Sequence, residues 1–420
     1  MSEVNIQTSH PLRIVIIGGG AAGFFAAIAC AEAAPGAEVT LLEKTAHFLA
    51  KVRISGGGRC NVTHACFEPR PLSQRYPRGD RALIAPFHRF QPQDTIAWFA
   101  ERGVRLKTEA DGRMFPITDS SETIIDCLLQ AARQAGVQLL AKHGVDRARR
   151  LDGGGFELDL STGATLQCDR LLLAIGGCRS AAAGALAEML GHRLEPPVPS
   201  LFAFHSAAPL LEGLAGLSME TVEASIPETG LRERGPLLIT HTGVSGPAIL
   251  RLSAWGARVL HDCSYLFPLY VNWLPAFDGE SIKAELRARR EANPAKLVAN
   301  TPLHPVPSRL WERLLHVSGI GTETRWSNLS RDGAQALAAA LTRSILPIDG
   351  KSLNKDEFVT CGGVSLREVD LKTMESRICP GLYFAGEVLD IDGITGGFNF
   401  QAAWTTGWIA AQAMASQAVD

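Results

Sequence analysis

The chain has 420 residues, of which 46% are hydrophobic and 20% charged, and its formal net charge is −2. This composition excludes a globally disordered chain and leaves no overall field that would draw the protein to nucleic acid or membrane. At ~100–200 residues per domain, the length predicts two or three domains. The nine cysteines are scattered without a CxxC pair, which predicts reduced thiols in the cytoplasm and no metal site.

The first elements predict a strand–turn–helix–strand unit. Arg13–Ile17 is a short apolar run of a buried parallel strand, Phe24–Ala34 is a helix, and Glu38–Glu43 is a second strand. The stretch 14–31 carries no charge over eighteen residues, enough for a membrane span or a signal peptide. Its glycines fall where a soluble βαβ turn needs them, so the soluble interpretation is preferred.

The turn of this unit carries a dinucleotide fingerprint. Gly18, Gly20 and Gly23 stand in G-x-G-x-x-G spacing between strand and helix. The first glycine permits a tight turn, the second lets a pyrophosphate approach, and the third lets helix and strand pack closely. Glu43 ends the second strand, where an acid binds ribose hydroxyls and disfavours a 2′-phosphate. FAD or NAD is therefore expected rather than NADP.

Further along, residues 70–90 contain three prolines and five arginines against one acid and are expected to form an extended loop. After residue 196 the sequence pattern predicts mostly β-strands, and near residue 361 it returns to alternating strands and helices. Other helices are expected at Gln93–Arg102, Ser121–Ala135, Glu280–Arg290, Asp332–Thr342 and Phe400–Ala415. Other strands are expected at Val137–Leu140, Phe156–Leu160, Ala164–Gln167, Arg170–Ile175, Leu201–His205, Glu220–Ile226, Pro236–Thr240, Ser344–Ile348 and Leu382–Ala385.

Two long motifs carry a family resemblance. Residues 51–61 read K-V-R-I-S-G-G-G-R-C-N, and residues 381–399 contain G-E-V-L-D followed by G-G-F-N. With further blocks at 112–116, 240–247 and 359–364, the chain resembles the YhiN/BaiN-like family of FAD-dependent oxidoreductases over nearly its whole length. This family is also labelled after an aminoacetone oxidase. The stretch 174–187 departs from the family pattern, with Ile175 in place of a threonine and an alanine-rich run after it, as in a divergent branch.

The resemblance implies an α/β fold: a Rossmann-like, glutathione-reductase-like FAD-binding domain split by an inserted β-rich domain with a helical subdomain. The FAD-binding domain would comprise residues 1–195 and 361–420. The β-rich domain would comprise 196–278 and 343–360, and the helical subdomain 279–342.

The resemblance also implies which residues hold FAD. The glycine turn and Glu43 would bind the ADP part, residues 55–61 the phosphates and flavin, and the far motif the ribitol and the flavin pyrimidine. The expected cofactor-binding residues are Gly18, Gly20, Ala22, Gly23, Glu43, Lys44, Lys51, Ser55, Gly56, Gly58, Arg59, Cys60, Asn61, Ala174, Gly176, Gly386, Glu387, Gly396, Gly397, Phe398 and Asn399.

Catalytic candidates are few. His241, in a Thr-His-Thr-Gly turn, is a candidate proton donor, and a structural histidine is an equal alternative. Arg113 either binds an anionic substrate or pairs with a carboxylate. Cys60 lacks a redox partner at a recognised spacing, so a packing role is preferred. The arginines of 70–89 form either a solvated surface or a lid with a phosphate-binding rim.

The expected function is an FAD-dependent oxidoreductase, with NAD(P)H as a candidate transient electron donor and a small unsaturated or amine substrate. No second dinucleotide fingerprint occurs, so NAD(P)H would dock directly over the flavin. One alternative is an aminoketone oxidase that uses dioxygen. Another is an RNA-acting flavoprotein that reduces uridine in ribosomal RNA, with RNA the less favoured partner. The oligomeric state is left open.

Overall fold

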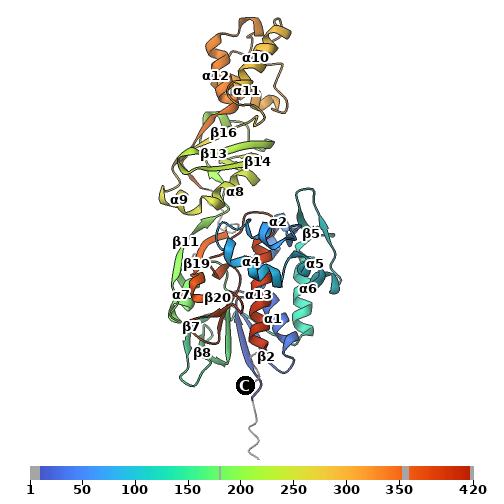
Figure 1. Cartoon of the computed structure of the whole chain (residues 1–420), viewed down its shortest axis with the longest axis vertical. Coiled ribbons are helices and arrows are strands. Elements are labelled where there is room, and N and C mark those ends of the chain that lie inside the picture. The colour runs from blue at the N-terminus through green and yellow to red at the C-terminus, as the bar shows by residue number, and fades with distance from the viewer. Residues whose placement is uncertain (1–9, 179–180, 352–358, 417–420) are drawn as a thin grey trace, which may run out of the picture. The chain divides into compact units, whose positions relative to one another are not determined.

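A computed structural model describes residues 10–178, 181–351 and 359–416 of the chain. The chain forms two compact units, which we describe separately (Figure 1). The split unit comprises Met1–Val198 and Val359–Asp420, and the inserted unit comprises Pro199–Phe358. Within the described residues, no helix combines the length and the apolar character that crossing a membrane requires.

The split unit is built on a seven-stranded sheet. In order of pairing its strands are β20 (Val369–Asp370), β21 (Glu375–Ser376), β22 (Leu382–Phe384), β10 (Arg170–Leu173), β1 (Arg13–Ile17), β2 (Glu38–Glu43) and β6 (Gln138–Ala141). The five strands from β22 to β6 are parallel, and β20 and β21 add an antiparallel edge. Ile14 and Ile16 of β1 are fully buried, because a parallel sheet is covered on both faces.

Two helices from opposite ends of the sequence meet in this unit. Helix α1 (Ala21–Ala33) packs against α13 (Phe398–Ser416), and α6 (Ser121–Gln134) also contacts α1. Phe25 of α1 and Trp404 of α13 are buried with ring centroids 5.3 Å apart. The first and last described helices therefore share one core.

Smaller elements complete the split unit. They are a sheet of β3 (Thr63–His64), β5 (Arg113–Pro116) and β4 (Leu106–Thr108); a sheet of β7 (Val145–Arg150), β8 (Phe156–Leu160) and β9 (Thr165–Cys168); the pair β11 (Leu194–Ser200) and β19 (Val359–Val364); and helices α2 (Ala50–Gly58), α5 (Pro92–Glu101) and α7 (Ala181–Met189). The pair β11–β19 lies where the chain leaves this unit and re-enters it.

The prediction of an extended loop over residues 70–90 is wrong. The segment forms helices α3 (Pro69–Ser73) and α4 (Asp80–Arg89), which pack against each other. Pro69 occupies the first turn of α3, where the missing N–H has no cost. In α4, Leu83 and Phe87 lie four residues apart and are fully buried, so burial of one apolar face offsets the helix bond that Pro86 removes.

The inserted unit is an antiparallel sheet with helices. Its strands, in order of pairing, are β17 (Ser344–Ile348), β16 (Phe267–Asn272), β13 (Ser218–Ile226), β14 (Leu231–Thr240), β15 (Gly243–Ser245), β12 (Phe204–His205) and β18 (Gly350–Lys351). Its α-helices are α8 (Pro247–Trp255), α9 (Ala257–Asp262), α10 (Ser281–Ala292), α11 (Ser308–Val317) and α12 (Arg331–Thr342). Helix α12 contacts both α10 and α11, and one apolar core with three fully buried tryptophans, Trp273, Trp311 and Trp326, runs through the unit.

This architecture confirms the predicted α/β, Rossmann-like fold split by a β-rich insertion. Most predicted elements occur within a few residues of their expected bounds. The strand expected at Leu201–His205 is reduced to Phe204–His205, because Leu201 has a positive φ of 56° that ends extended structure. Residue 180 of the alanine-rich run lies outside the described residues, and the rest forms α7.

Candidate functional site

The glycine turn is packed against the neighbouring strand end. A Cβ on Gly18 would lie 2.3 Å from the Ala174 carbonyl oxygen, and a Cβ on Gly23 would lie 2.0 Å from the Gly18 carbonyl oxygen. Gly20 caps α1, and a Cβ there would meet no heavy atom within 4 Å. Space is thus left open at the N-terminus of α1, where the first helical N–H groups have no intrahelical partner.

Glu43 holds this turn together. Its carboxylate accepts hydrogen bonds from the Gly19 N–H at 2.9 Å and from the Thr45 N–H at 2.8 Å. An ionised carboxylate has about four acceptor positions, so two remain for ribose hydroxyls. Lys44 is exposed beside it.

The 50–58 segment is a helix with a sharp kink. Ser55 is extended, with ψ 148°, and Gly56, Gly57 and Gly58 follow with φ of 58°, 69° and 84°. Three successive left-handed residues are strained for any side chain other than glycine. The Ser55 hydroxyl donates to the Val52 carbonyl at 2.8 Å, which fixes the start of the kink. A Cβ on Gly57 or Gly58 would meet nothing within 4 Å, so backbone is exposed here to an approaching ligand.

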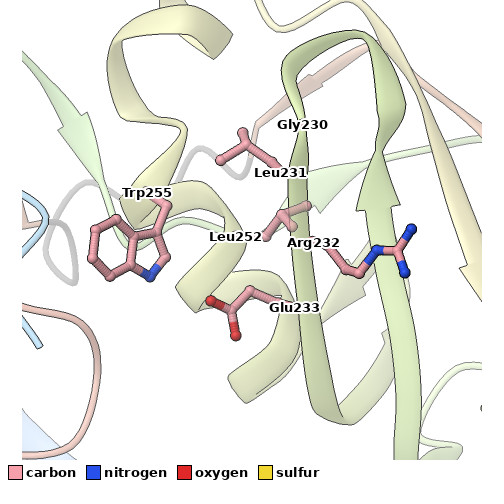
Figure 2. A pocket seen from close by; sticks show the side chains of 6 residues that line it. All are labelled: Gly230, Leu231, Arg232, Glu233, Leu252 and Trp255. Atoms are coloured by element: carbon pink, nitrogen blue, oxygen red, sulfur yellow. The ribbon is translucent and has the colours of Figure 1, made fainter. Parts of the chain in front are cut away.

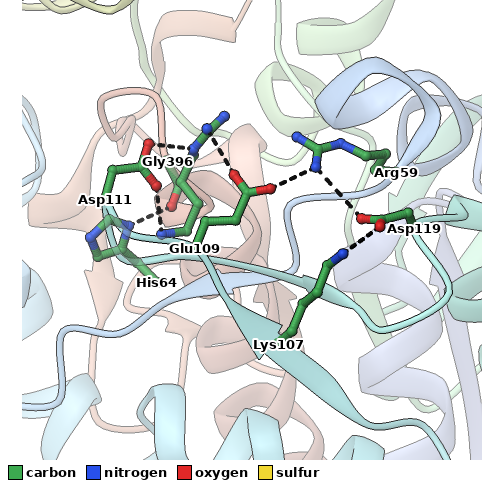
Figure 3. Close-up of polar contacts among 8 residues, drawn as sticks. Arg59, His64, Lys107, Glu109, Asp111, Asp119 and Gly396 are labelled. Atoms are coloured by element: carbon green, nitrogen blue, oxygen red, sulfur yellow. Dashed lines mark hydrogen bonds and ion pairs between the residues drawn. The ribbon is translucent and has the colours of Figure 1, made fainter.

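Arg59 is engaged by carboxylates. Its guanidinium lies 2.7 Å from Glu109 and 3.5 Å from Asp119, and it stacks 4.0 Å from the Phe115 ring centroid. Figure 3 shows this group together with Lys107, which pairs with Asp119 and is the main cause of the lowered pKa of that carboxyl. The cofactor contact expected for Arg59 would require this pairing to open.

The next two residues face inward. Cys60 is fully buried, and burial raises the pKa of its thiol to about 12, so it stays protonated and unreactive near neutral pH. With its side-chain amide in the orientation that satisfies both polar atoms, the Asn61 oxygen accepts from the Gly397 N–H at 3.0 Å and the nitrogen donates to the Thr63 carbonyl at 3.0 Å. Asn61 therefore connects the kinked segment with the distant GGFN motif.

The ends of β10 and β22 form a third part of the site. Ala174 and Gly176 follow β10, and Gly386 and Glu387 follow β22. The Glu387 carboxylate accepts from the Thr360 N–H at 2.8 Å and pairs with Lys51 at 2.7 Å. A Cβ on Gly386 would lie 2.9 Å from the Ala22 Cβ. These contacts bring together the carboxyl ends of parallel strands, where ligands of open α/β sheets bind.

The 393–399 loop is the fourth part. The Asn399 amide accepts from the Gly393 N–H at 2.8 Å and donates to the Gly393 carbonyl at 2.9 Å, which closes the loop on itself. The Tyr76 hydroxyl donates to the Phe398 carbonyl at 2.6 Å. Gly396 and Gly397 precede α13, so its N-terminal N–H groups and dipole are presented beside them.

His64 is a site residue that the sequence reasoning missed. Its Nδ1–H donates to the Gly396 carbonyl at 3.0 Å (Figure 3). Its ring stacks on Phe398 with centroids 4.6 Å apart. Burial is the main cause of a lowered pKa, so the neutral ring is favoured. Only its position three residues after the 51–61 motif could have drawn attention to it.

A buried polar network fixes these pieces behind the site. The Gln401 amide oxygen accepts from the Thr63 hydroxyl at 2.6 Å and from the Thr95 hydroxyl at 2.9 Å, all three residues being fully buried. The Trp404 indole donates to the Val62 carbonyl at 2.9 Å. Buried polar groups satisfied in this way specify one arrangement of the elements that carry them.

The two catalytic candidates lie in different units. Arg113, on β5, pairs with Asp111 at 2.7 Å and with Glu109 at 2.9 Å. Of the two roles considered for Arg113, this contact agrees with pairing to a carboxylate. Its strand neighbour across the sheet is His64. His241 is exposed in the inserted unit, on the turn between β14 and β15.

Two cavities of the inserted unit are lined by described residues. One of about 710 Å³ is lined by His241, Glu212 and Arg309 among others. A smaller one of about 290 Å³ lies beside Trp255, which is 42% exposed, with Arg232 and Glu233 on the neighbouring strand (Figure 2). Neither of these two cavities is lined by an expected cofactor residue.

The split unit as a whole fits a flavin dinucleotide. All the expected cofactor residues belong to it, and contacts join its four parts: Gly18 with Ala174, Lys51 with Glu387, and Asn61 with Gly397. The open space at Gly20 suits a pyrophosphate, and Glu43 suits a ribose. Among the described residues, no cluster of three or more histidine, cysteine or acidic side chains could hold a metal ion.

Comparison with known proteins extends this picture. A family model described as HI0933-like protein Rossmann domain matches residues 12–413. The chain is 34% identical over 408 residues to a protein of Escherichia coli (strain K12) named ribosomal RNA dihydrouridine synthase, covering 95% of this chain and 96% of that protein. It is 30% identical over 413 residues to a 3-dehydro-bile acid delta(4,6)-reductase of Clostridium scindens, covering 96% and 99%.

Solved structures show the same fold at low identity. A flavocytochrome c3 fumarate reductase superposes with a TM-score of 0.52 at 17% identity, covering 98% of this chain and 79% of that one. A 3-ketosteroid-delta4-(5alpha)-dehydrogenase from Rhodococcus jostii RHA1 gives 0.51 at 14% identity, covering 99% of both chains.

Proposed function

Because the chain belongs to the HI0933-like Rossmann family and is an FAD-dependent oxidoreductase, we propose that it reduces a carbon–carbon double bond conjugated to a carbonyl group. NAD(P)H is the proposed electron donor. One observation carries this proposal: two relatives aligned over nearly the whole chain have names with different substrates but related chemistry. Dihydrouridine, the product in the first name, is uridine reduced at the double bond conjugated to its C4 carbonyl, and the second name states reduction of delta(4,6) double bonds in a 3-dehydro bile acid. The resemblance found in the motifs is confirmed by the family match.

Bound FAD would supply the two-electron redox chemistry. The net reaction adds two electrons and two protons across the double bond, while NAD(P)H is oxidised to NAD(P)⁺ and a proton comes from solvent or a side chain. The glycine turn and Glu43 would hold the ADP part, and the backbone at 56–58 and 396–397 would face the flavin. The N-terminus of α13 would favour negative charge beside it.

We propose uridine in ribosomal RNA as the substrate. The relative named for that reaction is 34% identical over 95% of this chain, and a second relative with the same name, from Haemophilus influenzae, is 28% identical over 96%. A small fused-ring enone is the second candidate, favoured by the 30% identical bile acid reductase. The cytoplasm is the expected compartment, on cysteine usage.

The test is an assay of the purified yellow holoprotein with NADH or NADPH under anaerobic conditions. Three substrates are compared: a ribosomal RNA transcript, a steroid 4-en-3-one, and an aminoketone with dioxygen readmitted. Bleaching of the flavin by NAD(P)H, followed by a gain of two hydrogen atoms in a uridine on mass spectrometry, is the expected result. Oxidation of the aminoketone with reduction of dioxygen to hydrogen peroxide, and no reaction of the flavin with NAD(P)H, would instead establish the oxidase alternative.

A further inference from the structure

The connection between helices α3 and α4, residues 74–79, is bonded to residues 392–398. The Ile394 N–H donates to the Arg75 carbonyl at 2.9 Å, and the Tyr76 hydroxyl, fully buried, donates to the Phe398 carbonyl. Arg78 forms an ion pair with Asp392, whose side chain is fully buried. The 70–89 segment, which carries five arginines, is therefore attached to the loop of the candidate FAD site.

The same segment presents other arginines to solvent. Arg70, Arg75 and Arg81 are exposed, and none of the three forms an ion pair with any residue in the described ranges. The exposed acids closest to them in sequence are Glu68 and Asp80. We call these three residues the arginine rim. Unlike Arg78, these three arginines form no ion pair with a described carboxylate.

One residue of the rim, Arg75, lies close enough to His64 and Cys66 for its charge to act on both. Burial, and to a smaller degree the charge of Arg75, lower the pKa of His64, whose ring holds the Gly396 carbonyl. Arg75 also acts on the neighbouring Cys66 thiol, whose pKa is raised chiefly by burial. Arg75 thus stands within electrostatic range of the loop, on an anchored backbone.

A uridine in folded RNA has to leave its base stack to reach a buried cofactor. Its flanking phosphates then need fixed cations, which position the strand without reading its sequence. Arginine suits this task because its planar guanidinium binds phosphate in a bidentate way. We propose that the arginine rim binds the phosphates flanking the target nucleotide. This inference depends on the proposed ribosomal RNA substrate.

The experiment compares two holoprotein variants that lose the same charge. R70A/R75A/R81A removes the rim, and R287A/R290A/R325A removes three exposed arginines of the inserted unit that also form no ion pair within the described residues. Binding of a ribosomal RNA transcript is measured by fluorescence anisotropy across a salt series. FAD affinity and NAD(P)H oxidation with ferricyanide serve as readouts independent of RNA.

The rim variant is expected to bind the transcript at least about tenfold more weakly, and its log–log salt dependence should flatten by roughly 2–3, since each phosphate contact contributes about 0.7–0.9. Its FAD affinity and ferricyanide activity should match wild type, because the Arg75 carbonyl that accepts from the Ile394 N–H is kept and burial, rather than Arg75, is the main cause of the lowered pKa of His64. An unchanged salt slope, or an equal loss of RNA affinity in the matched variant, would show that the arginine rim does not bind the phosphates. Wild-type protein that neither binds nor modifies the transcript would overturn the substrate itself.

Discussion

The glycine turn at 18–23 and the loop at 393–399 are two parts of the candidate FAD site that are far apart in sequence, and they are held differently. The turn is fixed by backbone packing, with Gly18 against Ala174, and by one acid from the adjacent strand, Glu43. The loop is fixed by side chains more than 300 residues away in sequence, among them His64 and Tyr76. Changes in the turn should therefore damage the fold, whereas changes around the loop should loosen the cofactor and spare the fold.

The largest effect is expected from Gly18→Ala. The new Cβ would lie 2.3 Å from the Ala174 carbonyl oxygen, at a φ of +115°. Overpacking and backbone strain together should lower the free energy of unfolding by about 2–5 kcal/mol, measured by chemical denaturation.

Gly36→Ala is the matched control for that substitution, because its Cβ would meet nothing within 4 Å and its φ is not positive. A stability of Gly18→Ala equal to that of Gly36→Ala would show that the turn is not held by this packing.

An intermediate effect is expected from Glu43→Ala. The substitution removes the acceptor of the part-buried Gly19 N–H, at about 1 kcal/mol, whereas the exposed Thr45 N–H can bond to water instead. It also removes the proposed ribose contact. FAD should dissociate with a Kd roughly 10- to 100-fold higher, as measured by recovery of flavin fluorescence. His241→Ala, in the other unit, should keep wild-type FAD affinity and slow turnover. Full activity in the His241 variant would remove that residue from the mechanism.

The smallest effect is expected from Asn61→Ala, which tests the loop. The Gly397 N–H would lose its acceptor, and FAD affinity should fall by about fivefold for a loss of ~1 kcal/mol. Unfolding of the apoprotein should change less than in Gly18→Ala. If Asn61→Ala instead destabilised the apoprotein as much as Gly18→Ala does, the contrast between turn and loop would be lost.

This contrast also explains what the sequence could predict. The glycine turn and Glu43 lie within 26 residues and follow the periodicity of one βαβ unit, so their local pattern suffices. His64 and Gln401 carry no local signal, because their partners, Gly396 and Thr63, are brought to them only by the folded chain. Long-range contacts of this kind leave no periodicity to detect.

Charged residues were the hardest to assign. The family resemblance predicts that Arg59 contacts the cofactor, but its guanidinium pairs with Glu109 and Asp119, which lie at least 50 residues further along the chain. Residues 70–90 were expected to be a loop because their prolines suggested breaks. Two of those prolines lie within helices, where burial of Leu83 and Phe87 decides the outcome. Composition shows how much charge a segment has, and only the fold shows which charged residues form ion pairs with each other.

The pairing of α1 with α13 has a consequence for how the protein is made. A ribosome delivers the glycine turn first, but the other half of the site, from Gly386 to Asn399, emerges only after the whole inserted unit has been synthesised. Until then Phe25 has no Trp404 to pack against, and the candidate FAD site lacks its C-terminal residues. Cofactor capture should thus coincide with completion of the split unit, so that bound flavin marks chains whose two distant halves have found each other.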